Sequence, residues 1–270
     1  MNAPWVELST LGFLVIASIG LAAGTLGGLL GVGGSLIIIP LLTICYGRDQ
    51  HLYQAAAMVV NIAVSVPSAL RHRRAGAMIP QALRWMIPLA VVGVVLGVAL
   101  SNLPIFQGPQ GGIWLGRLLA LFQLYVIALN IHRLLQPSSN TTANARITPL
   151  ASASTGGAMG VVAGLLGIGG GAVAVPMQQA IMAMPLRNAI ANSAAVICLS
   201  ATIGALVKNA TLAQHGMPWW TGLLLAAMLA PTAAIGGRLG ANLTHSLPTR
   251  QVRIALIIVL ALSAYKMAAL

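Results

Sequence analysis

The sequence predicts an all-α polytopic membrane protein that consists of two homologous halves, which we expect to be inverted repeats. Of its 270 residues, 58% are hydrophobic and 6% are charged, whereas about 25% of the residues in a soluble domain are charged. Long apolar runs recur along the chain and are continuous, as in membrane-spanning helices, and they lack the alternation of a β-barrel. A glycine-rich motif also occurs twice, which indicates the internal repeat.

Most of the apolar runs are long enough, or nearly so, to cross a hydrocarbon core of roughly 30 Å. They leave no stretch of the chain that we expect to form a separate soluble domain. In chain order the runs are Leu8–Leu30, Leu36–Tyr46, Ala55–Leu70, Met86–Leu100, Ile113–Ile131, Ile147–Leu166, Ala189–Val207, Trp219–Ile235 and Ile254–Leu270.

The two copies of the glycine-rich motif read GLLGVGGSLIIIP (Gly28–Pro40) and GLLGIGGGAVAVP (Gly164–Pro176). Their offset is 136 residues, about half of the chain, and the glycines and the final proline recur in the same order. We therefore expect a first transmembrane repeat over residues 1–135 and a second over residues 147–270. The polar stretch QPSSNTTANAR, residues 136–146, is the expected linker between them.

Each copy places three glycines within four residues, and each glycine costs a helix roughly 1 kcal/mol. We therefore expect the helix to break at both motifs. An opened backbone at membrane depth is tolerated only inside protein or beside a water-filled cavity, and transporters use such breaks to direct half-helix N-termini at anionic groups. Each half is expected to form a hairpin bent at the glycines, followed by three transmembrane helices. Ser35 is expected to cap the segment after the first break.

A second set of glycines recurs every four residues ahead of each break. This spacing places them on one helix face, where the missing side chain lets another helix approach closely. We interpret them as packing sites. They are Gly20, Gly24, Gly28, Gly156, Gly160 and Gly164.

The net charge is +12, and Glu7 and Asp49 are the only acidic residues. The basic residues form no stripe or aromatic-interleaved patch, which argues against nucleic-acid binding. If each hairpin returns to the side from which it starts, ten basic residues collect on one side and four on the other, as the positive-inside rule requires. The ten are Arg71, Arg73, Arg74, Arg84, Arg133, Arg146, Arg187, Arg238, Arg250 and Arg253.

The shortage of carboxylates favours an anionic substrate, because the field of the chain is positive throughout. Glycine-rich turns and helix N-termini supply N–H donors for an oxyanion, and polar side chains in the next helix add others. Hydrogen bonding between helices is the alternative role of these side chains. The substrate-binding candidates are Gly31, Gly33, Gly34, Ser35, Asn61, Ser65, Gly167, Gly169, Gly170, Asn192 and Ser193.

Four further residues lie near the expected helix ends. Arg117 and Arg253 are weaker candidates that attract anions to opposite mouths of the pathway, with snorkelling to the membrane interface as the alternative. His51 and His72 are expected to face water, with a proton relay as the alternative. Since no intramembrane carboxylate is available to carry a proton, we expect anion movement to be driven by the membrane potential.

The paired glycine motifs resemble those of the sulfite exporter TauE/SafE family of bacterial membrane permeases. The turns LGVALSNLP (Leu96–Pro104) and LGANLTHSLP (Leu239–Pro248) are also similar to turns before the last helix of each half in that family. The resemblance covers nearly the whole chain. It implies a multi-pass protein of the bacterial inner membrane that exports sulfite or transports small organosulfur anions, works without a cofactor, and is not an enzyme; a homodimer is a further expectation.

Two other functions stay open from the sequence. A thiol-redox electron carrier would use Cys45 and Cys198, although their separation of 153 residues does not match the repeat offset. A channel-like permease for another small solute would share the two-half architecture. A metal permease is disfavoured because intramembrane His, Asp and Glu ligands are not seen, so no metal site is predicted.

Overall fold

The structure is a computed structural model that describes residues 10–47, 49–135, 146–244 and 248–269. These residues form α-helices and two short 3₁₀ turns, with no strand among them. Apart from Arg146, the expected linker lies outside the described residues. The elements are α1 (Thr10–Leu30), α2 (Ser35–Tyr46), α3 (Gln50–Arg74), α4 (Pro80–Ser101), η1 (Pro104–Phe106), α5 (Gly108–Leu135), α6 (Pro149–Leu166), α7 (Gly171–Ile181), α8 (Leu186–Ala210), η2 (Thr211–His215), α9 (Trp220–Leu243) and α10 (Thr249–Ala269).

The order of elements in the first half of the chain recurs in the second. A long helix, a short helix and three long helices follow one another as α1 to α5 and again as α6 to α10. Among the described residues, 7 helices are long and apolar enough to cross a membrane, and α2 is a shorter apolar helix. The predicted all-α polytopic membrane fold is confirmed.

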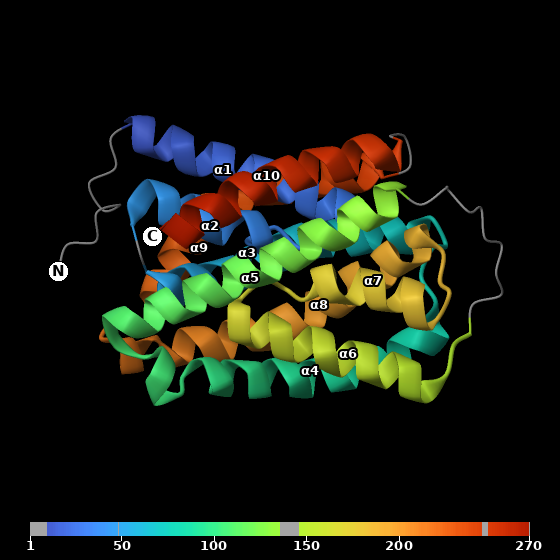
Figure 1. The fold of residues 1–270 in the computed structure, drawn as a ribbon, viewed down its shortest axis with the longest axis horizontal. Helices are drawn as coiled ribbons and strands as arrows, with labels where there is room; N and C mark the ends of the chain where they lie inside the picture. Colours follow the sequence, from blue (N-terminus) through green and yellow to red (C-terminus); the bar gives the residue numbers. More distant parts are fainter. Residues whose placement is uncertain (1–9, 48, 136–145, 245–247, 270) are drawn as a thin grey trace.

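The short helices return toward the end from which the preceding long helix starts. In Figure 1, α1 begins at the end marked N and α2 comes back toward it, whereas α6 begins at the opposite end and α7 comes back there. The helices α1 and α6 therefore run in opposite directions. These directions agree with an inverted arrangement of the halves, and the inverted relation and the repeat boundaries stay predictions.

The two halves interlock, because the first helix of each packs on the fourth helix of the other. These pairs are α1 with α9 and α6 with α4. A Cβ atom built on Gly24 would meet the backbone carbonyl of Ala233, and one on Gly160 would meet that of Ala90. The other glycines of the four-residue series make the same kind of close backbone contact. Their interpretation as packing sites is confirmed.

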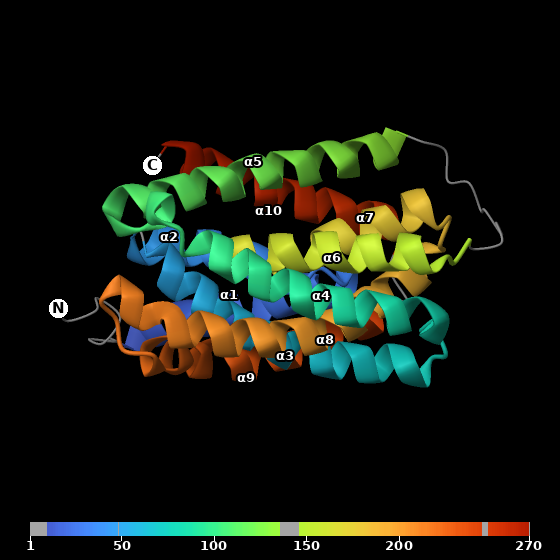
Figure 2. The ribbon, with the colours of Figure 1, turned by 90° about the horizontal axis from the view of Figure 1, so that it is seen from below.

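Helices α3 and α8 form the centre of the protein. They pack against each other and are the most buried of the candidate membrane spans. Helices α5 and α10, the last of each half, also pack on each other, and Figure 2 shows them side by side along one edge of the molecule. The short helices lie between this edge and the centre, and most of α2 is buried.

Helix α2 contains a proline whose effect is compensated by another helix. Pro40 has no N–H group, so the carbonyl of Leu36, four residues earlier, loses its helical partner. The side chain of Gln123 in α5 is fully buried and donates from Nε2 to this carbonyl at 3.4 Å. A polar side chain in the apolar α5 is thereby explained.

The orientation of the chain can be tested by labelling introduced cysteines in a variant that lacks Cys45 and Cys198. Ala75 follows α3 at the arginine-rich end, and Gln214 lies at the other end; both are exposed. We expect Ala75→Cys to react with a membrane-impermeant maleimide only from the cytoplasm, and Gln214→Cys only from outside, because arginines are retained in cytoplasmic segments. Labelling of both positions from one face would contradict the inverted arrangement.

Candidate functional site

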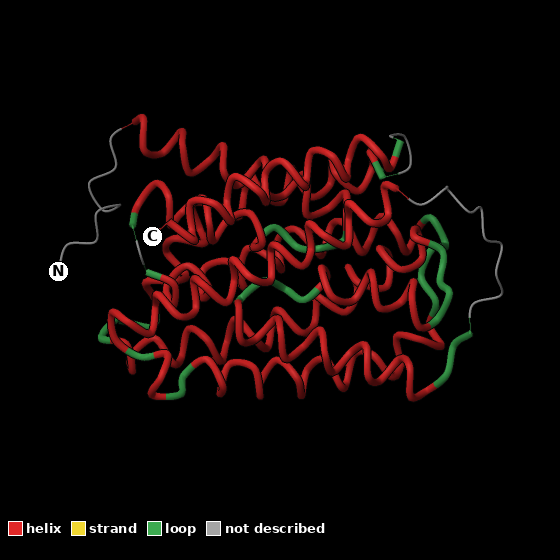
Figure 3. The backbone as a smooth tube through the Cα atoms, in the orientation of Figure 1, coloured by secondary structure: helices red, strands yellow, loops and turns green. Residues whose placement is uncertain are grey.

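The two glycine motifs break their helices at the middle of the molecule. Figure 3 shows two loop segments halfway along the length of the molecule, whereas the remaining loops lie at its ends. The first break is Gly31–Gly34, between α1 and α2, and the second is Gly167–Gly170, between α6 and α7. A Cβ atom on Gly171 would meet the carbonyl of Gly31. The predicted breaks are therefore confirmed, and the structure also places them in direct contact.

The side-chain amide of Asn61 in α3 lies between the two breaks. Gly33 has a φ of +81° and Gly169 a φ of +72°, a backbone conformation that other residues rarely adopt. A Cβ atom on Gly33 would lie 2.8 Å from Asn61 Oδ1, and one on Gly169 would lie 2.8 Å from Asn61 Nδ2. Both glycines are therefore required by backbone conformation and by the closeness of the same amide.

Asn61 also determines how α2 begins. Its Oδ1 accepts the backbone N–H of Ser35 at 3.2 Å, and its Nδ2 donates to Ser35 Oγ at 2.9 Å. Ser35 is the first residue of α2, and the N-cap is Gly34, which makes no side-chain capping bond. The prediction that Ser35 caps α2 is wrong, because the free N–H at the helix start is satisfied from α3 instead.

Each break rests on the third helix of the other half at equivalent positions. A Cβ atom on Gly31 would lie 2.8 Å from the carbonyl of Ile190 in α8, and one on Gly167 would lie 2.7 Å from the side chain of Gln54 in α3. Gln54 and Ile190 differ by the repeat offset of 136 residues. Ser193 in α8 donates to the carbonyl of Gly31 at 2.7 Å. The predicted candidates Asn61 and Ser193 thus lie at the breaks.

Gln54 is a residue of this site that the sequence analysis missed. Its side chain is completely buried, and neither Oε1 nor Nε2 has a hydrogen-bond partner among the described residues. A buried amide without partners costs several kcal/mol in an apolar medium, and such a group indicates a position where a water, an ion or a ligand binds. The only signal in the sequence was a glutamine at the start of an apolar run.

Gln54 and Asn61 belong to a polar stripe along the whole of α3. At 100° per residue, six polar side chains fall within an arc of about 60° on one face of this helix. All six are buried. Such side chains hydrogen-bond across helices, and polar or ionisable residues that face the interior of a helix bundle can also mark a substrate pathway. The stripe consists of Gln50, Gln54, Asn61, Ser65, Ser68 and His72.

The structure places some predicted candidates away from the breaks. Asn192 lies beside the end of α7, where its Oδ1 accepts the N–H of Ile79 at 2.8 Å and its Nδ2 donates to Gln178 at 3.2 Å. Ser65 donates to the carbonyl of Ile62 in its own helix at 3.4 Å. Asn192 therefore connects α8 with α7 and with the chain before α4.

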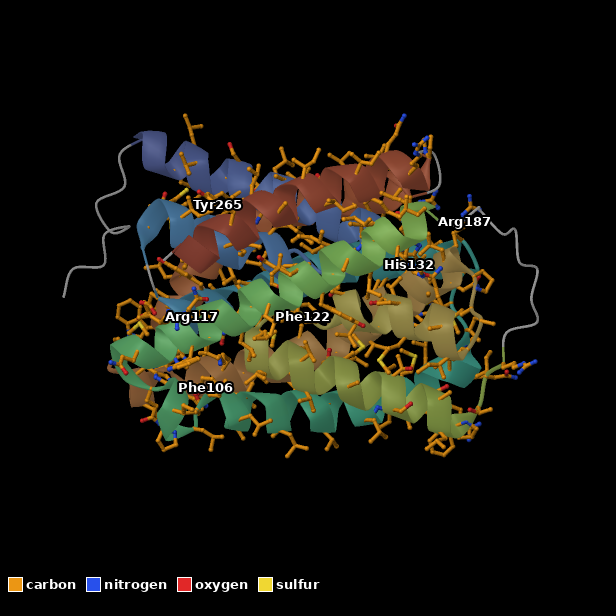
Figure 4. The ribbon with its side chains drawn as sticks, in the orientation of Figure 1. Phe106, Arg117, Phe122, His132, Arg187 and Tyr265 are labelled. Atoms are coloured by element: carbon orange, nitrogen blue, oxygen red, sulfur yellow. The ribbon has the colours of Figure 1, made fainter. Side chains whose placement is uncertain are left out.

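The charged candidates lie at the ends of the molecule. Arg117 is exposed, with its guanidinium 5.5 Å from the ring centre of Trp114, and Figure 4 shows it at the end opposite His132 and Arg187. Arg253 is partly exposed near the start of α10. The expectation that His51 and His72 face water is wrong, because both side chains are buried between helices.

The site favours an anion over a cation. The first turns of α2 and α7 meet here, and a helix N-terminus carries a partial positive charge and unpaired N–H groups. The only acid in the described part of the chain is Asp49, whose Oδ1 accepts the N–H of Leu52 at the start of α3. The described residues hold no group of three His, Cys, Asp or Glu side chains fit for a metal ion.

Two half-length helices whose N-termini meet inside a helical membrane protein are the arrangement used by transporters with broken helices. The family model of the sulfite exporter TauE/SafE family matches residues 16–267. The chain therefore belongs to this family, and its apolar helices make it a multi-pass membrane protein.

Its curated relatives carry names of the same kind. The chain is 28% identical to "Probable membrane transporter protein MamO" of Magnetospirillum gryphiswaldense over 89% of its length and 42% of the relative. It is 26% identical to "Probable membrane transporter protein YunE" of Bacillus subtilis, and the match covers 93% of this chain and 95% of the relative. A probable membrane transporter protein of Haemophilus influenzae is also 26% identical, and the match covers 89% of this chain and 92% of the relative. The chain thus spans about two fifths of the length of the MamO protein. No solved structure matches the present chain.

The glycines at the centre of each break can be tested with alanine. Gly33→Ala and Gly169→Ala are each expected to abolish transport while the protein still inserts, because the new Cβ would collide with Asn61 in a strained backbone. The readouts are substrate flux in proteoliposomes and the amount of folded protein in the membrane. Gly76→Ala is the matched control, since Gly76 has a φ of +65° but open space around it. Normal flux in both break variants would refute a functional role for the motif.

Proposed function

We propose that the protein exports small sulfur-containing oxyanions, such as sulfite or organosulfonates, across the bacterial inner membrane. The anion binds between the two helix breaks, where Asn61, Gln54 and the first turns of α2 and α7 surround it. The polar stripe of α3 provides its path to either end of the molecule.

One observation carries this proposal: the buried amide of Asn61 lies between the two helix breaks, and a second, unpartnered amide, that of Gln54, lies two helical turns away on the same face of α3, against the second break. The amide of Asn61 contacts both breaks, and Gln54 keeps two donors and an acceptor unused among the described residues. Paired N-termini and amide donors stabilise a negative charge without introducing a fixed cation that would hold it too tightly. The site therefore has the chemistry of an oxyanion site from which the anion can leave.

The choice of a sulfur oxyanion is supported by the family, which is described as a sulfite exporter family. The relatives' names mention transport without a substrate.

The membrane potential is sufficient to drive export of such an anion. In a cell that is negative inside, the potential favours the exit of each negative charge by roughly 2.3 kcal/mol per 100 mV. The described membrane-spanning helices contain no carboxylate that would carry a coupled proton. The proposed mechanism is therefore electrogenic, and no second ion is required.

The proposal is tested by flux measurements in proteoliposomes with sulfite, sulfate, thiosulfate and a sulfonate. Each anion is measured at a fixed membrane potential, with and without a pH gradient. We expect flux of at least one of these anions that follows the potential and is indifferent to the gradient. Absence of flux for all four anions would contradict the substrate class, and flux that follows only the pH gradient would contradict the mechanism.

Asn61→Asp tests the position of the site by placing a carboxylate between the breaks. The side chain keeps its shape, but the new charge would repel an anion, so we expect flux to fall about 100-fold or more. Gln81→Glu is the matched control, because it adds the same charge at an exposed position in the first turn of α4. Gln54→Leu is expected to reduce flux about 10-fold by removing an amide that bonds the anion. Equal flux in Asn61→Asp and the control would place the site elsewhere.

A further inference from the structure

A cluster of basic side chains lies buried at one end of the protein, apart from the helix breaks. Lys208 in the last turns of α8 is 1% exposed, and His51 in the first turn of α3 is 6% exposed. The ring of His51 stacks on that of His215 in η2, with ring centres 3.5 Å apart. We call Lys208, His51, His215 and Ser101 the Lys208 cluster.

The ammonium group of Lys208 has fewer partners than its charge requires. Its Nζ donates to Ser101 Oγ at 2.6 Å, whereas an ammonium has three donors. The described part of the chain offers no carboxylate in an ion pair with it, since Asp49 there is engaged at the start of α3. A buried charge without a counter-charge costs several kcal/mol, and an ionisable residue inside a membrane protein indicates a function with a specific partner.

The two histidines increase this need for a negative charge. His51 donates from Nε2 to the carbonyl of Phe106 at 2.8 Å, so this ring nitrogen carries a proton. His215 Nε2 lies 3.0 Å from Asn102 Oδ1. Lys208 is close enough to act electrostatically on both rings. Any proton gained by either imidazole therefore adds positive charge next to the ammonium, and nothing described here compensates for it.

We propose that the Lys208 cluster binds a small oxyanion at the outer mouth of the transport pathway. The ammonium of Lys208 holds the anion with its two remaining donors, and the stacked imidazoles complete the positive surface. Ser101, whose hydroxyl donates to the carbonyl of Val98 at 2.7 Å, positions the ammonium. His215 and Asn102 are only partly buried, so the anion reaches Lys208 past them from the end of the molecule.

The position of the cluster connects it with the central site. His51 precedes Gln54 by three residues, which is about 4.5 Å along the axis of α3. Figure 4 shows Phe106, the partner of His51, at the end of the molecule opposite Arg187. The arginine-rich end is the predicted cytoplasmic side, so the cluster faces outward. The role of the cluster as a binding site for anions that leave the pathway rests on the proposed export of anions. Anion binding by the cluster itself does not depend on that proposal.

The binding test uses the full-length protein with the central site disabled by Asn61→Asp. The unfolding temperature is measured in phosphatidylcholine nanodiscs with increasing sulfite or sulfate. A ligand that binds only the folded state raises this temperature. We expect Lys208→Met to weaken the apparent affinity about 10- to 100-fold, because it removes a charged hydrogen-bond donor. The matched control is Arg84→Gln, which removes one exposed positive charge at the opposite end.

Three results would overturn the proposal. Equal affinity in the Lys208→Met and Arg84→Gln proteins would show that the ammonium does not bind the anion. No effect of either anion on the protein with Lys208 intact would exclude the site. Stabilisation only in nanodiscs that contain phosphatidylglycerol, with no response to free sulfite or sulfate, would assign the cluster to a lipid phosphate instead.

A second variant covers the case in which Lys208→Met does not insert. His215→Gln changes a half-buried rim residue and keeps Lys208, and we expect it to weaken the affinity several-fold, by about 10-fold at most. An unchanged affinity in this variant would remove the imidazoles from the proposed site and overturn it.

Sided flux measurements separate this proposal from the proposed function. In a protein with Asn61 intact, Lys208→Met is expected to raise the KM for anion entering from the Gln214 side and to leave the KM from the Ala75 side unchanged. An equal rise on both sides would overturn the role of the cluster at the outer mouth. If no variant and no wild-type protein shows flux, the proposed function fails, and the nanodisc measurement still decides whether the cluster binds an anion.

Discussion

The centre of this protein depends on satisfying the polar backbone that two broken helices expose at membrane depth. Each break frees N–H and carbonyl groups that no lipid can bond. The amide of Asn61 takes up the first N–H of α2, and Ser193 donates to a carbonyl of the first break. Where protein partners run out, as at Gln54, a buried polar group is left that a polar ligand could satisfy.

The interlocked packing of the halves holds the breaks in place. Because α1 packs on α9 and α6 on α4, each broken helix is fixed by a helix from the other half. Glycines at these contacts bring the backbones together without intervening side chains. A rigid scaffold of this kind keeps two helix starts aimed at one amide, which separate halves with a loose interface would not achieve.

The two halves share a backbone plan but differ in the side chains that carry chemistry. At the repeat offset, Gln54 corresponds to Ile190, Asn61 to Ile197, and His72 to Lys208. The first half supplies the buried amides of the central site, and the second supplies the buried ammonium at one end. A duplicated fold therefore provides two similar helix breaks, while the positions of the polar groups make its two ends chemically different.

The sequence by itself determined the membrane-spanning helical class, the two breaks and the packing role of the spaced glycines. These features follow from local composition and spacing, since apolar length fixes a span and three glycines within four residues destabilise a helix locally. Only the tertiary structure decided that Asn61 bonds the start of α2, that Asn192 does not reach the breaks, and that Gln54 and Lys208 are buried without sufficient partners. Burial and pairing depend on which helices meet, and helices far apart in the chain meet through packing that the spacing along one helix does not encode.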